Sequence, residues 1–285
     1  MTKVRTVLAE QLAANLSSSS ERAWFAGHRR RLTQILTRDV PLGSELTLCV
    51  LGAGNANDLD LEVLAARYRA IHLVDIDPEA VERAHARESS ATRERLVRHA
   101  PIDVSGTLDR AERWAALQVT PAELAGHAEE TSARLLAKLA GPFDVVVSAC
   151  LLTQLQLGLL TVLGDRHPLF EAARYTVSST HLAVLSRLAR AGGRAVFVTD
   201  LSANDLAPEI EGAGDAELPE LVERLVAGGR VIRVADPRMI REIVRESPGP
   251  ARELELLPGI EAWLWQNGAS RTFLVYALEA RKARA

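Results

Sequence analysis

Between residues 46 and 100, short apolar runs rich in branched side chains alternate with segments whose apolar positions recur at helical spacing. The apolar runs are ELTLCVL, AIHLVDI and RLVRHA, and the helical segments between them are NDLDLEVLAARY and PEAVERAHARES. This alternation is typical of consecutive strand–helix–strand units, which build a parallel sheet. The pattern therefore predicts three strands and two helices over this stretch.

The same alternation continues to the end of the sequence. Thr120, Pro121 and Glu123 supply an N-cap, a first-turn proline and a capping-box glutamate for a helix that reaches about Leu139. We expect a strand FDVVVS, a loop, a long helix over about 168–191 that stops at two glycines, and a strand RAVFVTD. Residues 262–266 and 271–278 are β-prone and are joined through Asn267 and Gly268, a pair that favours hairpin turns.

Residues 1–45 read as two helical pieces, separated by four serines of which Ser20 can cap a helix beginning at Glu21. We therefore expect an N-terminal helical cap over 1–45 and one α/β domain over 46–285. The predicted fold of that domain is a doubly wound, mostly parallel seven-stranded sheet that ends in an antiparallel hairpin.

Residues 145–164 form an uncharged stretch that is long enough to be a membrane helix. It contains three threonines or serines and two glutamines, opens with three valines and follows Gly141-Pro142, so a buried strand, a loop and a helix start fit it better. At the N-terminus Glu10 interrupts any apolar stretch, which argues against a signal peptide. We expect a cytoplasmic protein whose mature chain begins near Met1.

Composition and charge narrow the class of protein. The 285 residues are 47% hydrophobic and 25% charged, which is typical of a globular protein with a core and excludes disorder of the whole chain. The net charge of −3 provides no overall field that attracts nucleic acid or an anionic membrane. Cys49 and Cys150 lie in strand-like runs without a His or Cys neighbour at ligand spacing, so we expect reduced thiols and no metal site.

The most informative stretch is a buried strand that runs into Gly52, Ala53 and Gly54. Glycines at such a turn let a ligand approach the backbone closely, although the pair alone fits a tight strand-to-helix turn equally well. Asp75 follows Gly52 by twenty-three residues and ends the next strand, where a carboxylate can accept hydrogen bonds from both hydroxyls of a ribose. The combination predicts a ligand that contains a nucleoside.

Charge distinguishes between two kinds of nucleoside ligand. A dinucleotide places its pyrophosphate on the N-terminus of the first helix, where the chain has Asp58, Asp60 and Glu62. Three carboxylates would repel that group, and Asn57 stands at the third glycine of the dinucleotide fingerprint. S-adenosylmethionine has no phosphate and carries two positive groups, so an acidic helix start favours it.

At this point the sequence resembles the class I S-adenosylmethionine-dependent methyltransferases over residues 46–278. The motifs that carry the resemblance are Gly52-Ala53-Gly54, Val74-Asp75-Ile76-Asp77-Pro78, Pro101-Ile102-Asp103-Val104, the strand FDVVVS and the run AGGRAVF. The resemblance implies this fold, this cofactor and transfer of a methyl group. The element that marks the family's amide and adenine-amino methylases is missing after the fourth strand.

The resemblance also assigns site residues. Gly52 and Gly54 would face the methionine portion, Asp75 the ribose, Ile76 the adenine face, Asp103 with the Val104 amide the adenine edge, and Ser148 the methionine end. Two positions depart from the family pattern, Val50 where an acidic residue is common and Ala56 where a glycine is common. Asn57 or Asp58 would then compensate in holding the ammonium group.

Several polar residues also have a structural explanation. Asp77 precedes a proline and a glutamate and is expected to cap the next helix. Asp75 and Asp103 could simply end strands. His181 shares a helical face with Val177 and Leu188 and is expected in the core.

The acceptor of the methyl group should lie beyond the carboxyl ends of the fourth and fifth strands. That position selects residues 149–154 and 200–205, and Trp24, Phe25 and His28 would form the inner face of a lid. If a general base is used, His167 and Asp200 are the catalytic candidates.

These observations predict methyl transfer to a small acceptor that is uncharged or anionic, with neither nucleic acid nor a membrane as partner. The sequence leaves the acceptor's identity and the oligomeric state open. A nicotinamide-dependent oxidoreductase and a non-catalytic nucleoside-binding protein remain as alternatives.

Overall fold

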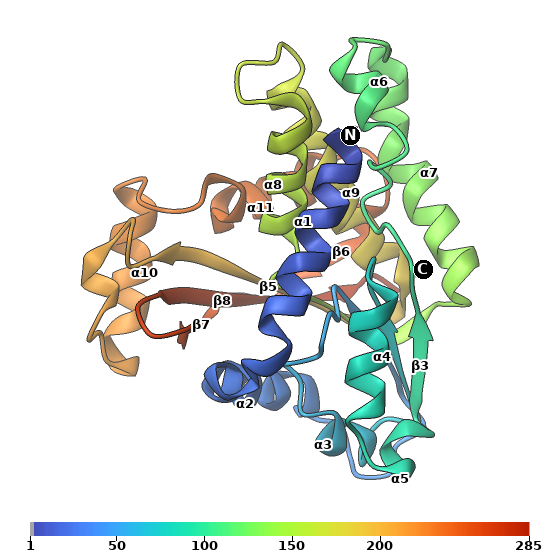
Figure 1. The fold of residues 1–285 in the computed structure, drawn as a ribbon, viewed down its shortest axis with the longest axis vertical. Coiled ribbons are helices and arrows are strands. Elements are labelled where there is room, and N and C mark those ends of the chain that lie inside the picture. Colours follow the sequence, from blue (N-terminus) through green and yellow to red (C-terminus); the bar gives the residue numbers. More distant parts are fainter. Residues whose placement is uncertain (1–2, 285) are drawn as a thin grey trace.

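The computed structural model describes residues 3–284, which form an eight-stranded sheet with helices on both faces (Figure 1). The strands are β1 (Thr47–Leu51), β2 (Ala70–Val74), β3 (Leu96–His99), β4 (Phe143–Ala149), β5 (Ala189–Ala203), β6 (Leu254–Leu256), β7 (Glu261–Gln266) and β8 (Thr272–Lys282). The helices are α1 (Lys3–Ser17), α2 (Ala26–Thr37), α3 (Leu61–Ala65), α4 (Pro78–Ala86), α5 (Ser90–Arg93), α6 (Ala111–Ala115), α7 (Pro121–Leu139), α8 (Leu152–Leu163), α9 (Phe170–Leu188), α10 (Leu218–Ala227) and α11 (Pro237–Glu246).

The sheet order is β3-β2-β1-β4-β5-β8-β6, and β7 also pairs with β8. The pairs among the first five strands are parallel, and β8 is antiparallel to β5. The predicted parallel sheet with a closing hairpin is confirmed. It has eight strands in place of seven because the outer edge of β8 pairs with β6 at Ala280–Lys282 and with β7 at Thr272–Ala277.

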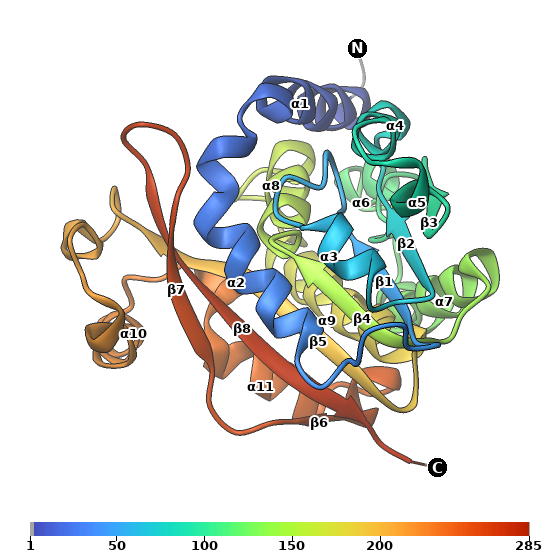
Figure 2. The ribbon, with the colours of Figure 1, turned by 90° about the horizontal axis from the view of Figure 1, so that it is seen from below.

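Alternation along the strands separates two cores, one on each face of the sheet (Figure 2). On one face Leu48 and Val50 of β1 pack with buried side chains of α2, α3 and α4. On the other face Cys49 and Leu51 pack in the cluster that contains the buried side chains of α7, α9, α10 and α11. The result is a helix–sheet–helix sandwich of three layers.

A third, smaller cluster lies beyond the carboxyl ends of the parallel strands. Val7 of α1, Trp114 of α6 and Leu159 and Val162 of α8 are buried in it, together with Val177 of α9. Figure 1 shows α1 lying in front of α8. This cluster holds α1 over the edge of the sheet where ligands of open α/β folds bind.

Several predicted helix boundaries are wrong. The second N-terminal helix begins at Ala26 after a 3-10 turn, and no side-chain cap precedes that turn, so Ser20 does not cap it. The long helix ends at Leu188, and Gly192 and Gly193 lie inside β5. The predicted hairpin is present, with strands Glu261–Gln266 and Thr272–Lys282, and the Asn267 amide donates to the Arg271 carbonyl at 2.8 Å across its turn.

The uncharged stretch 145–164 folds as most of β4 followed by α8. Among the described residues no helix is long and apolar enough to cross a membrane. The capping box at Thr120 and Glu123 is confirmed as the start of α7. Between β5 and β6 the chain adds α10 and α11, which the sequence pattern did not predict.

Candidate cofactor and acceptor sites

The turn after β1 brings backbone unusually close to its surroundings. Gly52 has φ +76°, and its amide donates to the Val74 carbonyl at 2.9 Å. A Cβ added there would lie 3.1 Å from the Leu151 side chain, and one added at Gly54 would lie 3.0 Å from Asn15 Oδ1. Glycine is required at Gly52 by both its positive φ and its neighbour.

Three arginines hold the loop that follows these glycines. Arg87 Nη2 donates to the Asn55 carbonyl at 3.0 Å, Arg22 Nη1 to that of Ala56 at 3.0 Å, and Arg29 Nη1 to that of Asn57 at 2.7 Å. Charged guanidinium donors thus satisfy carbonyls that have no helix or strand partner. The loop is fixed from its outer side.

Asp75 ends β2 and faces this turn. Its Oδ2 accepts from the Gly54 amide at 2.8 Å and its Oδ1 from the Asp77 amide at 2.9 Å. Burial raises the pKa of the Asp75 carboxyl, and these amide hydrogen bonds oppose the rise. Each carboxylate oxygen retains a lone pair for a ligand. Asp77 caps α4 by accepting from the Glu79 and Ala80 amides, as predicted.

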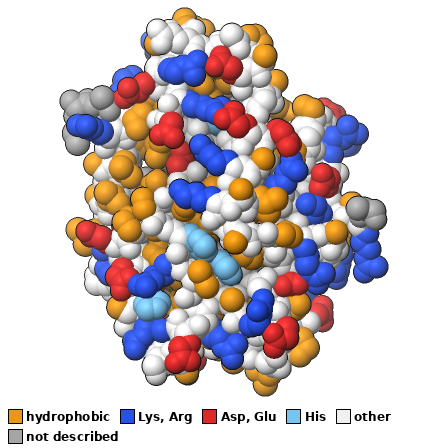
Figure 3. Space-filling view, turned by 90° about the vertical axis from the view of Figure 1, so that its right-hand side faces the viewer, with side chains coloured by type: hydrophobic (Ala, Val, Ile, Leu, Met, Phe, Trp, Pro, Cys, Tyr) orange, Lys and Arg blue, Asp and Glu red, His pale blue; other side chains and the backbone are white. Residues whose placement is uncertain are grey.

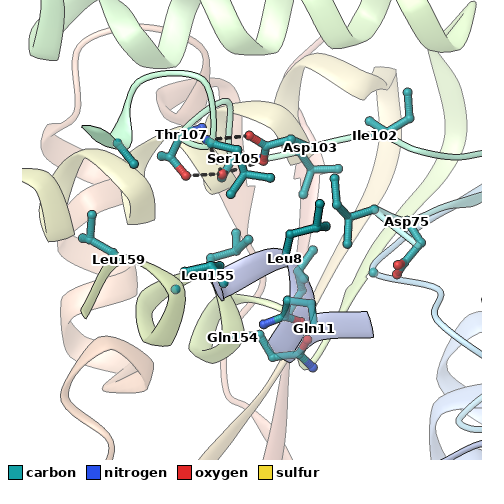
Figure 4. Close-up of a pocket in the computed structure, with 18 of the residues that line it drawn as sticks. Leu8, Gln11, Asp75, Ile102, Asp103, Ser105, Thr107, Gln154, Leu155 and Leu159 are labelled. Carbon is teal, nitrogen blue, oxygen red and sulfur yellow. Dashed lines mark hydrogen bonds between the residues drawn. The ribbon is translucent and has the colours of Figure 1, made fainter. Parts of the chain in front are cut away.

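Asp103 fixes the loop after β3. Its Oδ1 accepts from the Ser105 amide at 2.9 Å and hydroxyl at 2.6 Å, and its Oδ2 accepts from the Leu108 amide at 2.9 Å. Figure 4 shows Asp103, Ser105 and Thr107 joined in this way beside the cavity. The carboxyl has a structural role in the loop, whichever ligand the cavity holds.

The first cavity, of about 110 Å³, lies between this turn, the loop after β3, α1 and α8. Six of the predicted cofactor residues line it together: Gly52, Gly54, Asp75, Ile76, Asp103 and Val104. Leu8, Gln11 and Asn15 of α1 line it from the opposite side, and Figure 4 shows Gln11 next to Gln154 of α8.

Three other predicted residues lie outside this lining. Asn57 is buried with its amide donating to the Ser18 carbonyl at 2.7 Å, and Ser148 is fully buried with its Oγ 2.6 Å from His181 Nε2. His167 Nδ1 accepts from the Leu169 amide at 3.2 Å and Nε2 lies 3.1 Å from the Ala115 carbonyl. None of the three lines the first cavity or the acceptor side of the sheet edge, at the ends of β4 and β5.

The N-terminus of α3 does not face the first cavity. Asp60 caps it by accepting from the Val63 amide at 3.2 Å, and Asp60 and Val63 line a separate hollow beside α2. The nearby Asp58 is half-buried, and burial raises its pKa to about 7. No free helix N-terminus of α3 is therefore presented to the first cavity.

A second cavity, of about 550 Å³, lies beside the first at the ends of β4 and β5. Asp200 lines it and accepts from Thr153 Oγ1 at 3.1 Å, and burial raises the pKa of its carboxyl. Gln154 lines both cavities, so the two meet at the first turn of α8. Cys150, with φ +48°, also lines the second cavity.

The sequence analysis missed the cover of the first cavity. Of the three residues predicted as the inner face of a lid, Trp24 is 41% exposed and the other two pack on β7: Phe25 lies 5.0 Å from Trp265 between ring centroids, and the Trp263 indole donates to His28 Nδ1 at 3.0 Å. The cover is α1, and a Cβ at Gly158 of α8 would lie 3.0 Å from Val7. A glycine inside an apolar helix was the signal for such a close approach.

No family model and no curated protein matches the sequence. Solved structures that resemble it include the N-methyltransferase NodS from Bradyrhizobium japonicum, 15% identical, covering 92% of this chain and 98% of that one with a TM-score of 0.43. Magnesium protoporphyrin IX methyltransferase from Synechocystis, solved with bound SAH, is 14% identical, with 96% and 86% covered and a TM-score of 0.42. An rRNA methylase from Streptococcus thermophilus is 11% identical, with 93% and 95% covered and a TM-score of 0.38.

The sheet itself distinguishes between related folds. Dinucleotide-binding sheets share the order of the first five strands but add a further parallel strand. Here the strand next to β5 is antiparallel and belongs to a closing hairpin. The chain therefore has the fold of the class I S-adenosylmethionine-dependent methyltransferases.

Proposed function

We propose that this protein transfers a methyl group from S-adenosylmethionine to a small-molecule acceptor. The observation that carries the proposal is the first cavity, where the glycine turn after β1, the carboxylate at the end of β2 and the loop after β3 meet. This is the place where open α/β sheets bind ligands.

The residues that line the first cavity match the chemical groups of S-adenosylmethionine. Gly52 and Gly54 leave backbone open to a ligand, Asp75 offers acceptor oxygens for ribose hydroxyls, and Ile76 and Ile102 offer apolar surface for a base. When bound, the cofactor supplies a methyl group already activated by its sulfonium. The protein contributes alignment, which is a large part of catalysis for such a displacement.

A nicotinamide cofactor fits less well. Its pyrophosphate requires free amides at the start of the first helix. Here α3 has five residues, its first turn is capped by Asp60, and it does not line the first cavity. The structural role of α3 thus supports the methyltransferase over the oxidoreductase.

For an acceptor that must lose a proton, we assign the general base to Asp200. It lies in the second cavity, and a carboxyl with a raised pKa is a stronger base near neutral pH than an ordinary aspartate. His167 is not assigned this role, because both ring nitrogens have backbone partners.

Thermal unfolding with ligands tests the cofactor. Adenosylhomocysteine should raise the melting temperature in a concentration-dependent way, whereas NAD and NADP should not, because only a ligand of the folded state stabilises it. Stabilisation by NAD alone would overturn the proposal in favour of the oxidoreductase. Binding of adenosylhomocysteine without methyl transfer to any acceptor in a broad panel would favour a non-catalytic binding protein.

Substitution of Asp75 tests the site. Asp75→Asn keeps one oxygen acceptor but removes the charge, and should weaken adenosylhomocysteine binding by roughly 2 kcal/mol in a calorimetric titration. Asp215→Asn is the matched control, since Asp215 is 83% exposed and lies outside the lining of both cavities. Equal affinities of the two variants would remove Asp75 from the site.

A further inference from the structure

We infer that the second cavity binds the methyl acceptor, and that this acceptor is a flat, apolar molecule carrying an acidic group. That the bound molecule accepts a methyl group rests on the proposed function. The class of ligand is argued from the cavity alone. Its volume of about 550 Å³ suits a small molecule, within the range of about 300–1,000 Å³ found for ligand pockets.

The position of this cavity matches what methyl transfer requires. Gln154 lines both cavities, and Leu151 of the first adjoins Cys150 of the second. A donor in one cavity and an acceptor in the other would meet at the start of α8, beside Asp200. In-line displacement needs this kind of adjacency.

The walls of the second cavity favour a flat apolar body. Trp265 and Phe273 lie side by side, with ring centroids 5.3 Å apart and planes inclined by 29°. Phe170 and Leu160 line the cavity as well. Aromatic side chains contribute large contact surfaces and prefer offset stacking with another ring.

The charges of the lining favour an anion. Among the described residues that line this cavity, the ionisable acid–base side chains other than the Cys150 thiol are three arginines and Asp200. Two carboxylates outside the lining pair with these arginines. Glu171 contacts both Arg174 and Arg233, and Asp205 contacts Arg271. The lining itself thus carries three cationic side chains against one carboxyl, Asp200.

Three buried polar atoms without a hydrogen-bond partner belong to residues that line this cavity. They are Arg174 Nε, Trp265 Nε1 and Gln156 Oε1. The Arg174 side chain is 12% exposed, and Gln156 is 7% exposed. Leaving the two donors, Arg174 Nε and Trp265 Nε1, unpaired is costly, so a ligand that accepts from them is favoured, whereas the acceptor Gln156 Oε1 favours a donor group on the same ligand.

Arg174 is the specificity residue in this arrangement. Gln156 Nε2 donates to the Arg174 carbonyl at 3.1 Å and to Ser178 Oγ at 3.0 Å, which holds the Gln156 amide against α9 beside Arg174. An acidic group accepts from the Arg174 guanidinium, and a charge-assisted bond of this kind is stronger than a neutral one. The Arg174 guanidinium would repel a basic acceptor.

Three probes with the same ring and similar size test the ligand class. Binding of indoleacetate, indoleacetamide and tryptamine is measured by calorimetry, with and without adenosylhomocysteine. We expect the anionic probe to bind at least about tenfold more tightly than the neutral amide, and the cation to bind most weakly. No discrimination among the three, tightest binding of tryptamine, or no binding of any probe at millimolar concentration would overturn the inference.

Substitution of Arg174 tests whether this residue causes the preference for the acidic probe. Arg174→Met keeps much of the length and apolar surface of the side chain and should abolish the preference for acid over amide. Arg245→Met is the control, because Arg245 is 74% exposed and pairs with Glu246 on α11. A preference that survives in Arg174→Met overturns the assignment, provided that adenosylhomocysteine still stabilises the variant. Acid binding without adenosylhomocysteine binding would instead refute the proposed function and leave the ligand class standing.

Discussion

Some of the polar residues that the sequence analysis assigned to the site already have hydrogen-bond partners within the fold. Ser148 was assigned to the methionine end of the cofactor, but its hydroxyl is committed to His181 beneath the sheet surface. His181, expected in the core, is fully buried there, and burial lowers its pKa to about 4. Its Nδ1 has no partner, so the imidazole is stable only in its neutral form.

The pH dependence of stability follows from that lowered pKa. An unfolded histidine titrates near pH 6.5, so the unfolded state binds the proton first as the pH falls, and the stabilisation is lost between about pH 6.5 and 4. His181→Gln keeps a hydrogen-bonding partner for Ser148 and does not titrate. The free energy of unfolding of the native protein, relative to that of His181→Gln, should fall by roughly 3 kcal/mol from pH 7 to pH 4. Urea unfolding at each pH measures the difference.

The comparison with the variant is needed because other buried groups also change the stability as the pH falls. Burial lowers the pKa of His28 to about 3, which acts in the same direction as His181, and two carboxyls act in the opposite direction. Burial raises the pKa values of Asp75 and Asp200, and these carboxyls favour the folded state more as they become protonated. Parallel pH profiles for the native protein and His181→Gln would show that His181 does not titrate as a buried neutral group.

At the scale of elements, the sequence predicted strands more reliably than helices. The strands are short apolar runs with clear ends, and each one from β1 to β5 was placed. Helix α7 was also placed, because Thr120 and Glu123 form its capping box. The sequence did not predict the ends of helix α8, because the helix has neither a charge nor a side-chain cap and is apolar on most sides.

The candidate site could be predicted only in part for the same reason. Residues that follow strands converge at one edge of the sheet by topology alone, and six of them line the first cavity. The contribution of α1 depends on a contact with α8, more than 140 residues away, that no local pattern encodes. Likewise, Asn57 and Ser148 were assigned by resemblance, and only the packing around them shows that their side chains are already engaged.

Two glycines inside helices allow a matched test of the contact between α1 and α8. Replacing an exposed helical glycine by alanine stabilises a protein by about 0.5–1 kcal/mol. Gly126→Ala in α7 should show this gain, because a Cβ there meets nothing within 4 Å. Gly158→Ala in α8 should gain less or be destabilised, since its Cβ would lie 3.0 Å from Val7 Cγ1. Chemical unfolding of both variants decides, and equal gains would show that α1 is not packed there.

At the scale of the whole molecule, the expected cap over 1–45 combines two structural roles. Helix α2 belongs to the core, because Leu32, Ile35 and Leu36 are fully buried against the sheet. Helix α1 covers the first cavity, and Asn15 Nδ2 ties it to Asp77 Oδ2 at 3.1 Å. Removal of α1 opens only the third, smaller cluster, where Val7 is buried, and leaves the cores on the two faces of the sheet intact.

Deletion of residues 1–16 should therefore leave a cooperatively folded protein with a poorer cofactor site. Val7, Leu8, Gln11 and Asn15 would no longer line the cavity, and we expect adenosylhomocysteine to bind about tenfold more weakly or worse. Calorimetry on the truncated and full chains measures this change. Unchanged affinity would show that α1 takes no part in the site.

An RNA gel shift tests the expectation that nucleic acid is not a partner. Residues 1–45 carry seven basic and four acidic side chains, a balance of +3, on a remainder of −6. On the face drawn in Figure 3, basic and acidic side chains are interspersed. A salt-sensitive RNA gel shift of the full chain would contradict this expectation, whether or not deletion of 1–16, which removes two of the seven basic side chains, abolishes it.

The long-range docking of α1 also has a consequence for the order in which the molecule assembles. Lys3 Nζ donates to the Val162 carbonyl across 159 positions of the chain, whereas β1 and β2 pair across about twenty-three. During synthesis the first helix to emerge must therefore wait for one of the middle helices before it finds its place. In the finished protein such a late, peripheral contact opens at a lower free energy than the central strands do. Amide hydrogens of α1 should then exchange with solvent by local opening, while those of β1 and β4 exchange only when the whole domain unfolds.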